Sequence, residues 1–242
     1  MIAVVADIHA NRAALTAVLA EARARGADRL LVLGDVVGYH AEPVACVELL
    51  AGWPLDGVIG NHDLGAIGVG DRFAGRVAAS VQAWTAERLG AAERAFLAAL
   101  PRRLELGWCV AVHGCFTHPE SAIGYVTPVT AEANLRALGG TGVRLGLFGH
   151  SHVPAVHAIG ERDRFGLEPG PYPLPRHRAA IANPGSVGQP RDGDPRAAFA
   201  IYDPEAQTME LVRVPYDVDA TARAVRAAGL PEEIAARLME AR

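Results

Sequence analysis

Histidine, aspartate and asparagine residues gather in five short blocks, and each block follows a short apolar run. In chain order the blocks are Asp7-Ile8-His9, Gly34-Asp35, Gly60-Asn61-His62-Asp63, His113-Gly114 and Gly149-His150-Ser151-His152. Carboxylate, amide and imidazole groups are ligands for divalent metal ions. In extended backbone, residues two apart point to the same side, so Asp7 and His9 can converge on one ion. The spacing therefore indicates metal-ion chemistry.

One such block alone is weak evidence. A D-x-H or H-x-H triplet arises easily by chance, and a histidine beside a strand is more often a hydrogen-bonded structural residue than a ligand. Five blocks that each close an apolar run are much harder to obtain by accident. We therefore interpret them as parts of one site.

The elements that would position these blocks alternate between short β-branched runs and longer helical patterns, which is typical of β-α-β units. We expect strands at 2–6, 30–33, 57–59, 108–112, 143–148, 179–182, 197–202 and 209–214. We expect helices from the cap at Asn11 to Gly26 and at 43–51, 73–89, 91–100, 131–138, 218–228 and 231–240, with a surface loop at 161–178. The blocks then lie at the carboxyl ends of strands, where open α/β folds place their sites.

Composition narrows the chemistry. The chain has 242 residues, 50% of them apolar, a net charge of −4 and no lysine, which excludes lysine Schiff bases and a P-loop. A mildly acidic chain does not attract polyanions by its overall charge, so any nucleic-acid contact would have to be local. No apolar run approaches the ~18–20 residues that span a membrane, and no basic leader precedes the first apolar run. We expect a cytoplasmic protein with one domain over 1–242, its core at about 1–214 and terminal helices at about 218–241.

Two nucleophilic alternatives are weaker. The three cysteines, Cys46, Cys109 and Cys115, form no C-x-x-C pair, and Cys115 is more simply a buried apolar residue than a nucleophile. Ser186 lies in Pro184-Gly185-Ser186-Val187-Gly188, which lacks the glycine two positions before the serine that a nucleophile elbow needs.

The five blocks, in this order, resemble those of the calcineurin-like metallophosphoesterase superfamily: D-x-H, G-D, G-N-H-D/E, H-G and G-H-x-H. Residues 183–188 are similar to the N-P-G-S segment of its small bacterial and archaeal phosphodiesterases, and the resemblance covers about residues 1–203. It implies an α/β fold, a four-layer αββα sandwich of two mixed sheets flanked by helices. It also implies a two-metal centre.

The resemblance assigns roles by position. Asp7, His9, Asp35 and His152 would bind the first ion, and Asp35 would bridge to a second ion bound by Asn61, His113 and His150. His62 would stabilise the departing oxygen or donate a proton to it, and Asp63 would orient the His62 ring.

Two divalent ions ~3.5–4 Å apart can neutralise a phosphoryl group and lower the pKa of a bridging water, so that hydroxide attacks. The mixed oxygen and nitrogen ligands suit Mn²⁺ first, with Fe, Zn²⁺, Co²⁺ or Ni²⁺ as alternatives, better than Mg²⁺.

The chain departs from the family pattern in places that bear on substrate. Ala10 replaces the glycine of D-x-H-G, with a small expected effect on metal binding. The arginine of G-D-x-V-D-R-G is absent from 34–40, which disfavours a protein phosphatase. His62 stands where many small phosphodiesterases have cysteine, so monoesters can also be substrates.

We expect a metal-dependent phosphoesterase acting on small phosphodiesters or nucleotides. The alternatives are a non-catalytic metal-binding scaffold for a partner, a dinucleoside polyphosphate hydrolase, a phosphomonoesterase or a nuclease. The candidates for substrate contact are Asn11, Arg12, Tyr39, His40, His118 and Arg191. The amphipathic tail from Val218 can pack on its own core or on another copy, which leaves a homo-oligomer open.

Overall fold

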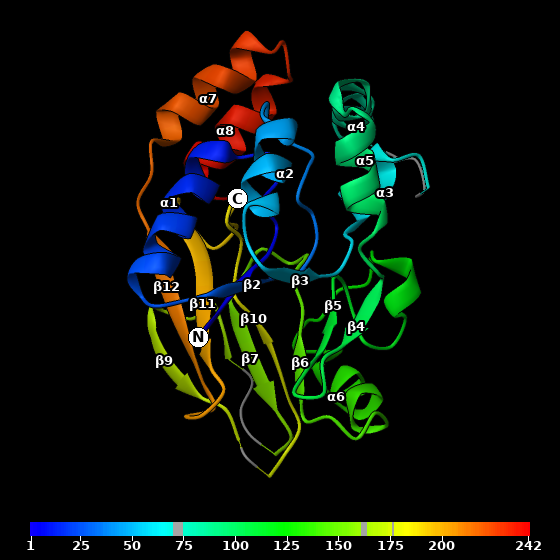
Figure 1. Ribbon diagram of the computed structural model, residues 1–242, viewed down its shortest axis with the longest axis vertical. Coiled ribbons are helices and arrows are strands. Elements are labelled where there is room, and N and C mark those ends of the chain that lie inside the picture. The colour runs from blue at the N-terminus through cyan, green and yellow to red at the C-terminus, as the bar shows by residue number, and fades with distance from the viewer. Residues whose placement is uncertain (70–74, 161–163, 176) are drawn as a thin grey trace.

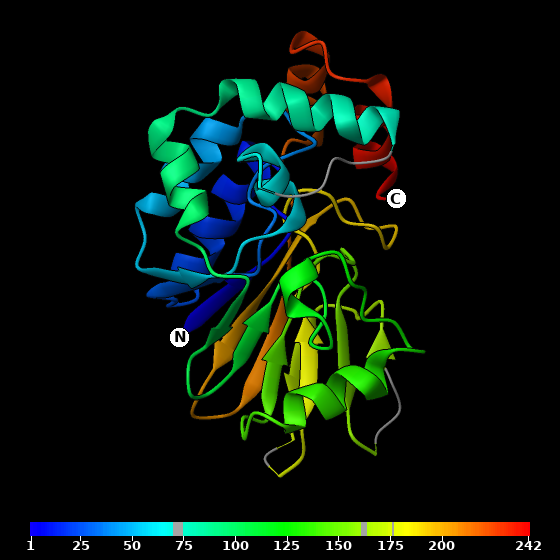
Figure 2. The same ribbon diagram turned by 90° about the vertical axis from the view of Figure 1, so that its right-hand side faces the viewer.

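Two six-stranded mixed β-sheets lie face to face, with helices on their outer sides (Figures 1 and 2). This computed structural model describes residues 1–69, 75–160, 164–175 and 177–242. The arrangement confirms the predicted four-layer αββα sandwich.

The first sheet has the order β3-β2-β1-β11-β12-β9. Its strands are β1 (Ile2–Val5), β2 (Arg29–Val32), β3 (Leu55–Gly57), β9 (Gly170–Pro173), β11 (Ala197–Asp203) and β12 (Thr208–Val214). β1, β2 and β3 run parallel, with Ala3 opposite Leu30, whereas β11 pairs antiparallel with β1. The carboxyl ends of β1 to β3 therefore share one edge of the sheet.

The second sheet has the order β4-β5-β6-β10-β7-β8. Its strands are β4 (Arg103–Glu105), β5 (Val110–Val112), β6 (Leu145–Leu147), β7 (Ala155–Ala158), β8 (Arg164–Phe165) and β10 (Ala180–Asn183). β5, β6 and β10 run parallel. Like the first sheet, it carries a group of parallel strands whose carboxyl ends lie together.

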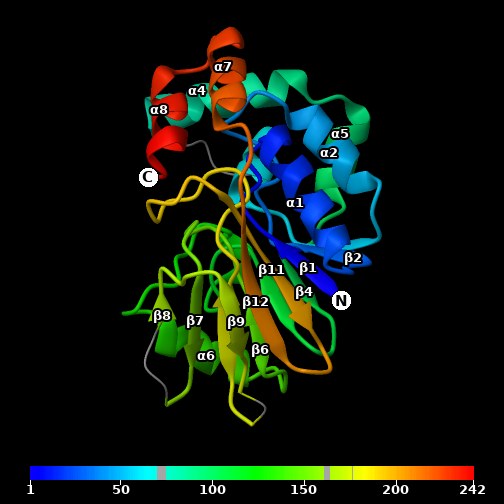
Figure 3. The same ribbon diagram turned by 90° about the vertical axis from the view of Figure 1, so that its left-hand side faces the viewer.

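Helices cover the outer faces and the end of the sandwich that bears the site (Figures 1 and 3). Their bounds are α1 (Arg12–Ala24), α2 (Pro43–Ala51), α3 (Asn61–Ala66), α4 (Arg76–Arg88), α5 (Ala91–Ala98), the 3₁₀ turn η1 (Pro119–Ser121), α6 (Ala131–Gly139), α7 (Val218–Ala227) and α8 (Glu232–Glu240). α1 and α2 share a core with the first sheet, and α6 packs on β6, β7 and β10 of the second. Val225 of α7 and Ile234 of α8 share a buried cluster with Val81 of α4, so the C-terminal helices pack on their own chain.

Continuous apolar runs form the inner strands because both of their faces are buried. In β1, Ala3 and Val5 pack toward the helices, and Val4 packs between the sheets. Leu30 and Leu31 of β2 divide in the same way. The side-chain alternation of a strand thus supplies two core layers from one apolar run.

The predicted ends of α1 are confirmed. The Asn11 side chain accepts the backbone N–H of Ala14 at 3.1 Å, which satisfies one free amide of the first turn. Gly26 follows the helix at φ +78°, the left-handed conformation that ends many helices.

Several sequence-based element predictions were wrong. The segment 161–178, expected to be a loop, contains β8 and β9 in its described part, and β9 is an edge strand that tolerates Pro171 and Pro173. β4, β7 and α3 were not predicted, and β3 lies two residues earlier than expected. The expected helix 73–89 is observed as α4 from Arg76, and its predicted start at Phe73 lies outside the described residues.

No described helix is both long and apolar enough to cross a bilayer.

Candidate metal centre

The five blocks meet where the parallel strands of both sheets end. Asp7 and His9 follow β1, Asp35 follows β2, and Asn61 opens α3 after β3. From the second sheet, His113 follows β5, and the segment after β6 carries His150 and His152. All seven predicted ligands are buried, with exposed fractions between 0% and 9%. The structure therefore brings together residues up to 145 positions apart in the sequence.

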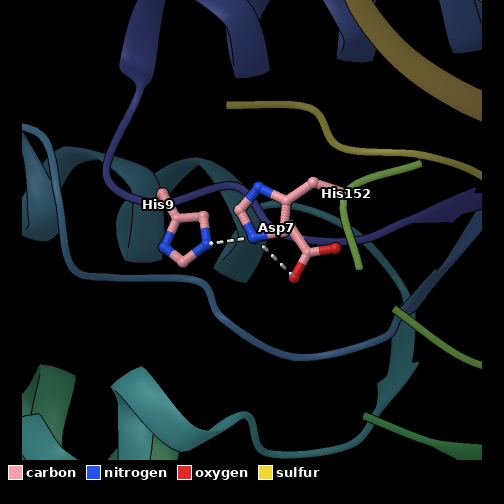
Figure 4. A group of neighbouring side chains, drawn as sticks. All are labelled: Asp7, His9 and His152. Carbon is pink, nitrogen blue, oxygen red and sulfur yellow. Dashed lines mark hydrogen bonds and ion pairs between the residues drawn. The ribbon is translucent and has the colours of Figure 1, made fainter. Parts of the chain in front are cut away.

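The first ligand group consists of Asp7, His9 and His152 (Figure 4). Nε2 of His9 lies 3.1 Å from Nε2 of His152, and the latter nitrogen lies 3.6 Å from Oδ1 of Asp7. The potential ligand atoms of the three residues all lie within 4.8 Å of one another. This spacing leaves room for a single cation between them.

The second ligand group consists of Asn61, His113 and His150. Nε2 of His113 lies 3.1 Å from Oδ1 of Asn61, and the rings of His113 and His150 have centroids 5.0 Å apart. Nε2 of His150 is buried and has no hydrogen-bond partner among the residues that the structure describes. A buried nitrogen lone pair left in this way fits a metal ligand.

Asp35 stands between the two groups. Its Oδ2 lies 3.5 Å from Nε2 of His9 and 3.3 Å from Nε2 of His113. Its Oδ1 accepts the backbone N–H of His62 at 2.8 Å. One oxygen of Asp35 thus faces both groups, while the other fixes the carboxylate to the start of α3.

Backbone carbonyls set the orientation of three imidazoles. Nδ1 of His9 donates to Val37 O (3.3 Å), Nδ1 of His113 to Leu33 O (2.7 Å) and Nδ1 of His152 to Gln189 O (2.5 Å). A carbonyl oxygen can only accept a hydrogen bond, so the imidazole nitrogen is the donor in each case. Each Nδ1 therefore carries the hydrogen, and each Nε2 faces the centre. This is the arrangement in which histidine binds a metal ion.

The Nε2 atoms of His9 and His152 face each other while both Nδ1 atoms carry hydrogens. Two neutral imidazoles would then direct their Nε2 lone pairs toward each other at 3.1 Å, which is repulsive. A cation bound by both nitrogens would remove this repulsion. The residues of this site fit divalent metal ions by donor type, burial and orientation.

Burial and mutual charge shift the pKa values of the cluster. Burial raises the pKa of Asp7 to about 7. Burial also opposes ionisation of Asp35, but His113 and the other nearby histidines hold its pKa well below its usual range. Burial alone would lower the pKa of His113, but Asp35 raises it to about 9. Without a cation, a proton on His113 balances the charge of Asp35, and a metal ion would take over that role.

The backbone at the site is strained. Five of the seven predicted ligands have positive φ angles, between 49° and 65°: Asp7, His9, Asp35, His150 and His152. Residues other than glycine adopt this region at a cost, and such strain clusters at functional sites. Close approach adds a further constraint, because a Cβ on Gly60 would overlap Oδ1 of Asp35.

His62 lies beside both groups, with its ring centroid 4.8 Å from that of His9 and 4.4 Å from that of Tyr39. Burial lowers its pKa to about 4. Asp63 accepts backbone N–H groups from Val37 and Gly60, both at 3.0 Å, and so ties the loop after Asp35 to α3. Orientation of the His62 ring by Asp63 stays a prediction.

The predicted substrate-contact residues fall into two sets. The Asn11 side chain is buried and forms hydrogen bonds with Ala14, Gly188, Tyr216 and Thr221. Arg12 pairs with Glu42, His40 donates to His9 O behind the centre, and His118 is exposed and contacts Thr117.

Tyr39 and Arg191 instead lie at the centre. The Tyr39 ring is 4.5 Å from that of His9, and Nη2 of Arg191 donates to the Tyr39 hydroxyl at 3.3 Å. The charge of Arg191 also contributes to the low pKa of His152, of which burial is the main cause. These two side chains are the predicted contacts that face the ligand groups.

Two features of the site escaped the sequence analysis. Ser186 was weighed only as a nucleophile, yet its Oγ donates to Asp7 O and accepts from Gln189 N, both at 2.8 Å. Tyr125 packs its ring 4.2 Å from that of His150. The asparagine-proline-glycine-serine segment offered a signal for Ser186, whereas no spacing pattern marks Tyr125.

The four-layer sandwich and its buried imidazole and carboxylate cluster define a metallophosphoesterase. The family model of the calcineurin-like phosphoesterase superfamily domain matches residues 1–207, and the chain belongs to that superfamily. Membership indicates a hydrolase for phosphorylated substrates that uses divalent metal ions.

Similar proteins agree with this assignment. The crystal structure of a metallophosphoesterase from Sphaerobacter thermophilus is 36% identical, with a TM-score of 0.88, and the match covers 100% of this chain and 99% of that one. An uncharacterized protein of Methanocaldococcus jannaschii is 35% identical over 98% of this chain and 97% of its own length. A hypothetical protein from Pyrococcus horikoshii shares the fold, with a TM-score of 0.76, 24% identity and 98% coverage of both chains.

Proposed function

We propose that this protein hydrolyses small phosphodiesters or nucleotides at a centre of two divalent ions. The observation that carries the proposal is the position of Asp35. Its Oδ2 lies within 3.5 Å of Nε2 of both His9 and His113, so one carboxylate can bridge two ligand groups. The first group, with Asp35, would hold one ion and the second group, with Asp35, the other.

Two ions bound there would supply positive charge for the phosphoryl group and a water acidic enough to attack it. The chain contributes fixed ligands, because backbone carbonyls orient the imidazoles before any ion binds. The mixed oxygen and nitrogen donors favour Mn²⁺, with Fe, Zn²⁺, Co²⁺ and Ni²⁺ as the alternatives.

His62 would act on the leaving group. It is 7% exposed, its backbone N–H donates to Oδ1 of Asp35, and its ring lies 4.8 Å from that of His9. From there it would stabilise the departing oxygen or donate a proton to it. Arg191 and Tyr39 would hold the phosphoryl oxygens, since guanidinium groups bind them with two parallel hydrogen bonds.

The decisive experiment compares metal content with turnover. Wild-type protein loaded with Mn²⁺ is assayed on bis-p-nitrophenyl phosphate and on p-nitrophenyl phosphate, and its bound metal is measured by mass spectrometry. We expect two ions per chain and faster hydrolysis of the diester. Asp35→Ala should abolish both double occupancy and turnover, whereas Asp28→Ala, an exposed acid paired with the N-terminus, should change neither.

Other results would point to the alternatives. Faster hydrolysis of the monoester would indicate a phosphomonoesterase, and preference for a dinucleoside polyphosphate would indicate that class of hydrolase. Two bound ions without turnover on any phosphoester would favour a metal-binding scaffold. Full turnover in Asp35→Ala would refute the proposed centre.

A further inference from the structure

Tyr125 is an aromatic side chain beside His150 that no part of the proposed reaction uses. It lies between η1 and α6, and 49% of it is exposed. Its ring centroid is 4.2 Å from that of His150, with the ring planes inclined at 39°. A half-exposed aromatic ring beside such a site offers a flat apolar face on which a ligand ring can stack.

The segment that carries Tyr125 is firmly held. Ala122 and Val126 on either side of it are buried at 1% and 2% exposure, in clusters with α3 and with α6. The hydroxyl of Thr130 donates to the backbone carbonyl of Tyr125 at 2.9 Å. With both neighbours anchored inward, the Tyr125 ring is directed outward over His150.

Two glycines set the distance of this segment from the metal ligands. A Cβ on Gly114, directly after His113, would lie 2.7 Å from the carbonyl oxygen of Gly124. A Cβ on Gly124 would overlap Sγ of Cys115. The absence of side chains at both positions lets the backbone before Tyr125 pack against the loop that bears His113.

A cationic residue lies beside the first ligand group. The backbone N–H of Arg191 donates to His152 O at 3.3 Å, and its guanidinium donates to the Tyr39 hydroxyl. The next residue, Asp192, forms a nearly buried ion pair with Arg213, which fixes this loop.

We propose that Tyr125 is a stacking platform that makes this site selective for phosphoesters carrying a planar aromatic group, as nucleotides do. The phosphoryl group lies between the ligand groups and Arg191, and the planar group lies on the exposed side of the Tyr125 ring. This inference rests on the proposed function, because it needs a phosphoryl group bound at the metal centre. Stacking on an aromatic side chain tolerates any flat ring, so the platform selects a class of substrate and no single base.

The test is direct binding of two phosphonates whose C–P bonds are not hydrolysed. Phenylphosphonate and methylphosphonate carry the same charged group and differ in the ring. Isothermal titration of the Mn²⁺-loaded protein should show phenylphosphonate binding about tenfold more tightly. Tyr125→Ala should bring the two affinities to within about twofold by weakening phenylphosphonate alone, and Tyr125→Phe should keep the preference.

Val129→Ala is the matched control, because Val129 is 93% exposed on the same segment, and it should keep the wild-type preference. Equal binding of both ligands by the wild type would overturn the platform and leave the proposed function standing. An equal loss for both ligands in Tyr125→Ala would overturn it too, since Tyr125 would then merely support His150. Binding of neither ligand to metal-loaded wild type would overturn the proposed phosphoryl site and the platform together.

Discussion

The two ligand groups differ in how they are enclosed and supported. In the first group, Asp7, His9 and His152 are at most 2% exposed, and all three have positive φ angles. In the second group, Asn61 is 9% exposed and His150 is 7% exposed, while His113 is fully buried. The first group is almost fully enclosed, whereas two of the three side chains in the second group keep a small exposed fraction.

This difference separates two tasks. Ligands that are strained and sealed have been fixed before any ion arrives, which favours tight binding and slow exchange. Ligands that keep a small exposed fraction leave space for water and substrate beside an ion. We therefore expect the first group to retain its ion and the second group to lie on the side from which substrate enters.

The largest effect should come from removing one histidine from each group. His152→Ala and His150→Ala should both abolish phosphodiester hydrolysis, because each removes a ligand. After dialysis against a weak chelator, His150→Ala should keep one ion per chain, measured by mass spectrometry, whereas His152→Ala should lose the tightly held ion. Equal retention in the two variants would contradict the distinction between the groups.

The next largest effect concerns His62, whose ring lies 4.8 Å from that of His9. His62→Asn should lower kcat by about 10²–10³-fold, the usual effect of removing a donor that stabilises a departing oxygen, and leave the number of bound ions unchanged. Metal analysis together with steady-state kinetics checks both parts. Since His62 also lies within ligand distance of His9 and Asp35, a loss of one ion would show that it is a ligand instead.

A smaller effect should follow from loosening the sealed side. Ser186→Ala removes the hydroxyl that joins the backbones of Asp7 and Gln189, and Gln189 in turn holds His152. Competition with a chelator should show about 10-fold weaker binding of the tightly held ion. Ser80→Ala, on the exposed face of α4, is the matched control and should leave the affinity for the ion unchanged. An equal loss of affinity in both variants would show that the Ser186 hydroxyl has no specific role in holding the ion.

The smallest effect should be a gain in stability at Ala10. This residue has φ +55° and is 1% exposed, so Ala10→Gly should relieve strain and raise the free energy of unfolding by about 0.5–1 kcal/mol. Denaturant unfolding measures it, with unchanged metal content expected. Ala20→Gly, on the exposed side of α1, should have the opposite sign, with a loss of about 1 kcal/mol; a loss in both variants would show that Ala10 is unstrained.

The sequence predicted the parts of this protein that depend on local pattern. Fully buried strands appear as continuous apolar runs, so β1, β2 and β11 could be located, together with the ligand-bearing ends of β1 and β2. The resemblance then supplied the assembly of these ends into one cluster, which periodicity alone does not give.

What escaped prediction depends on contacts between distant segments. β9 contains two prolines and, among the described strands, pairs with β12 alone, so it has no strand pattern of its own. Tyr125 is a lone aromatic in a loop whose place is set by the contact between Gly114 and Gly124. Asn11 had the features of a substrate contact, but its burial against Tyr216 and Thr221 depends on the fold of the C-terminal segment.

The centre also joins the two halves of the sandwich. Asp7 extends from the first sheet and His152 from the second, and the Asp7 carboxylate already accepts the backbone N–H of His150 across the seam. An ion shared by Asp7 and His152 would fasten one sheet to the other at their common edge. Resistance to unfolding would then rise with the concentration of free metal, which makes the ion a structural cross-link as well as a reagent.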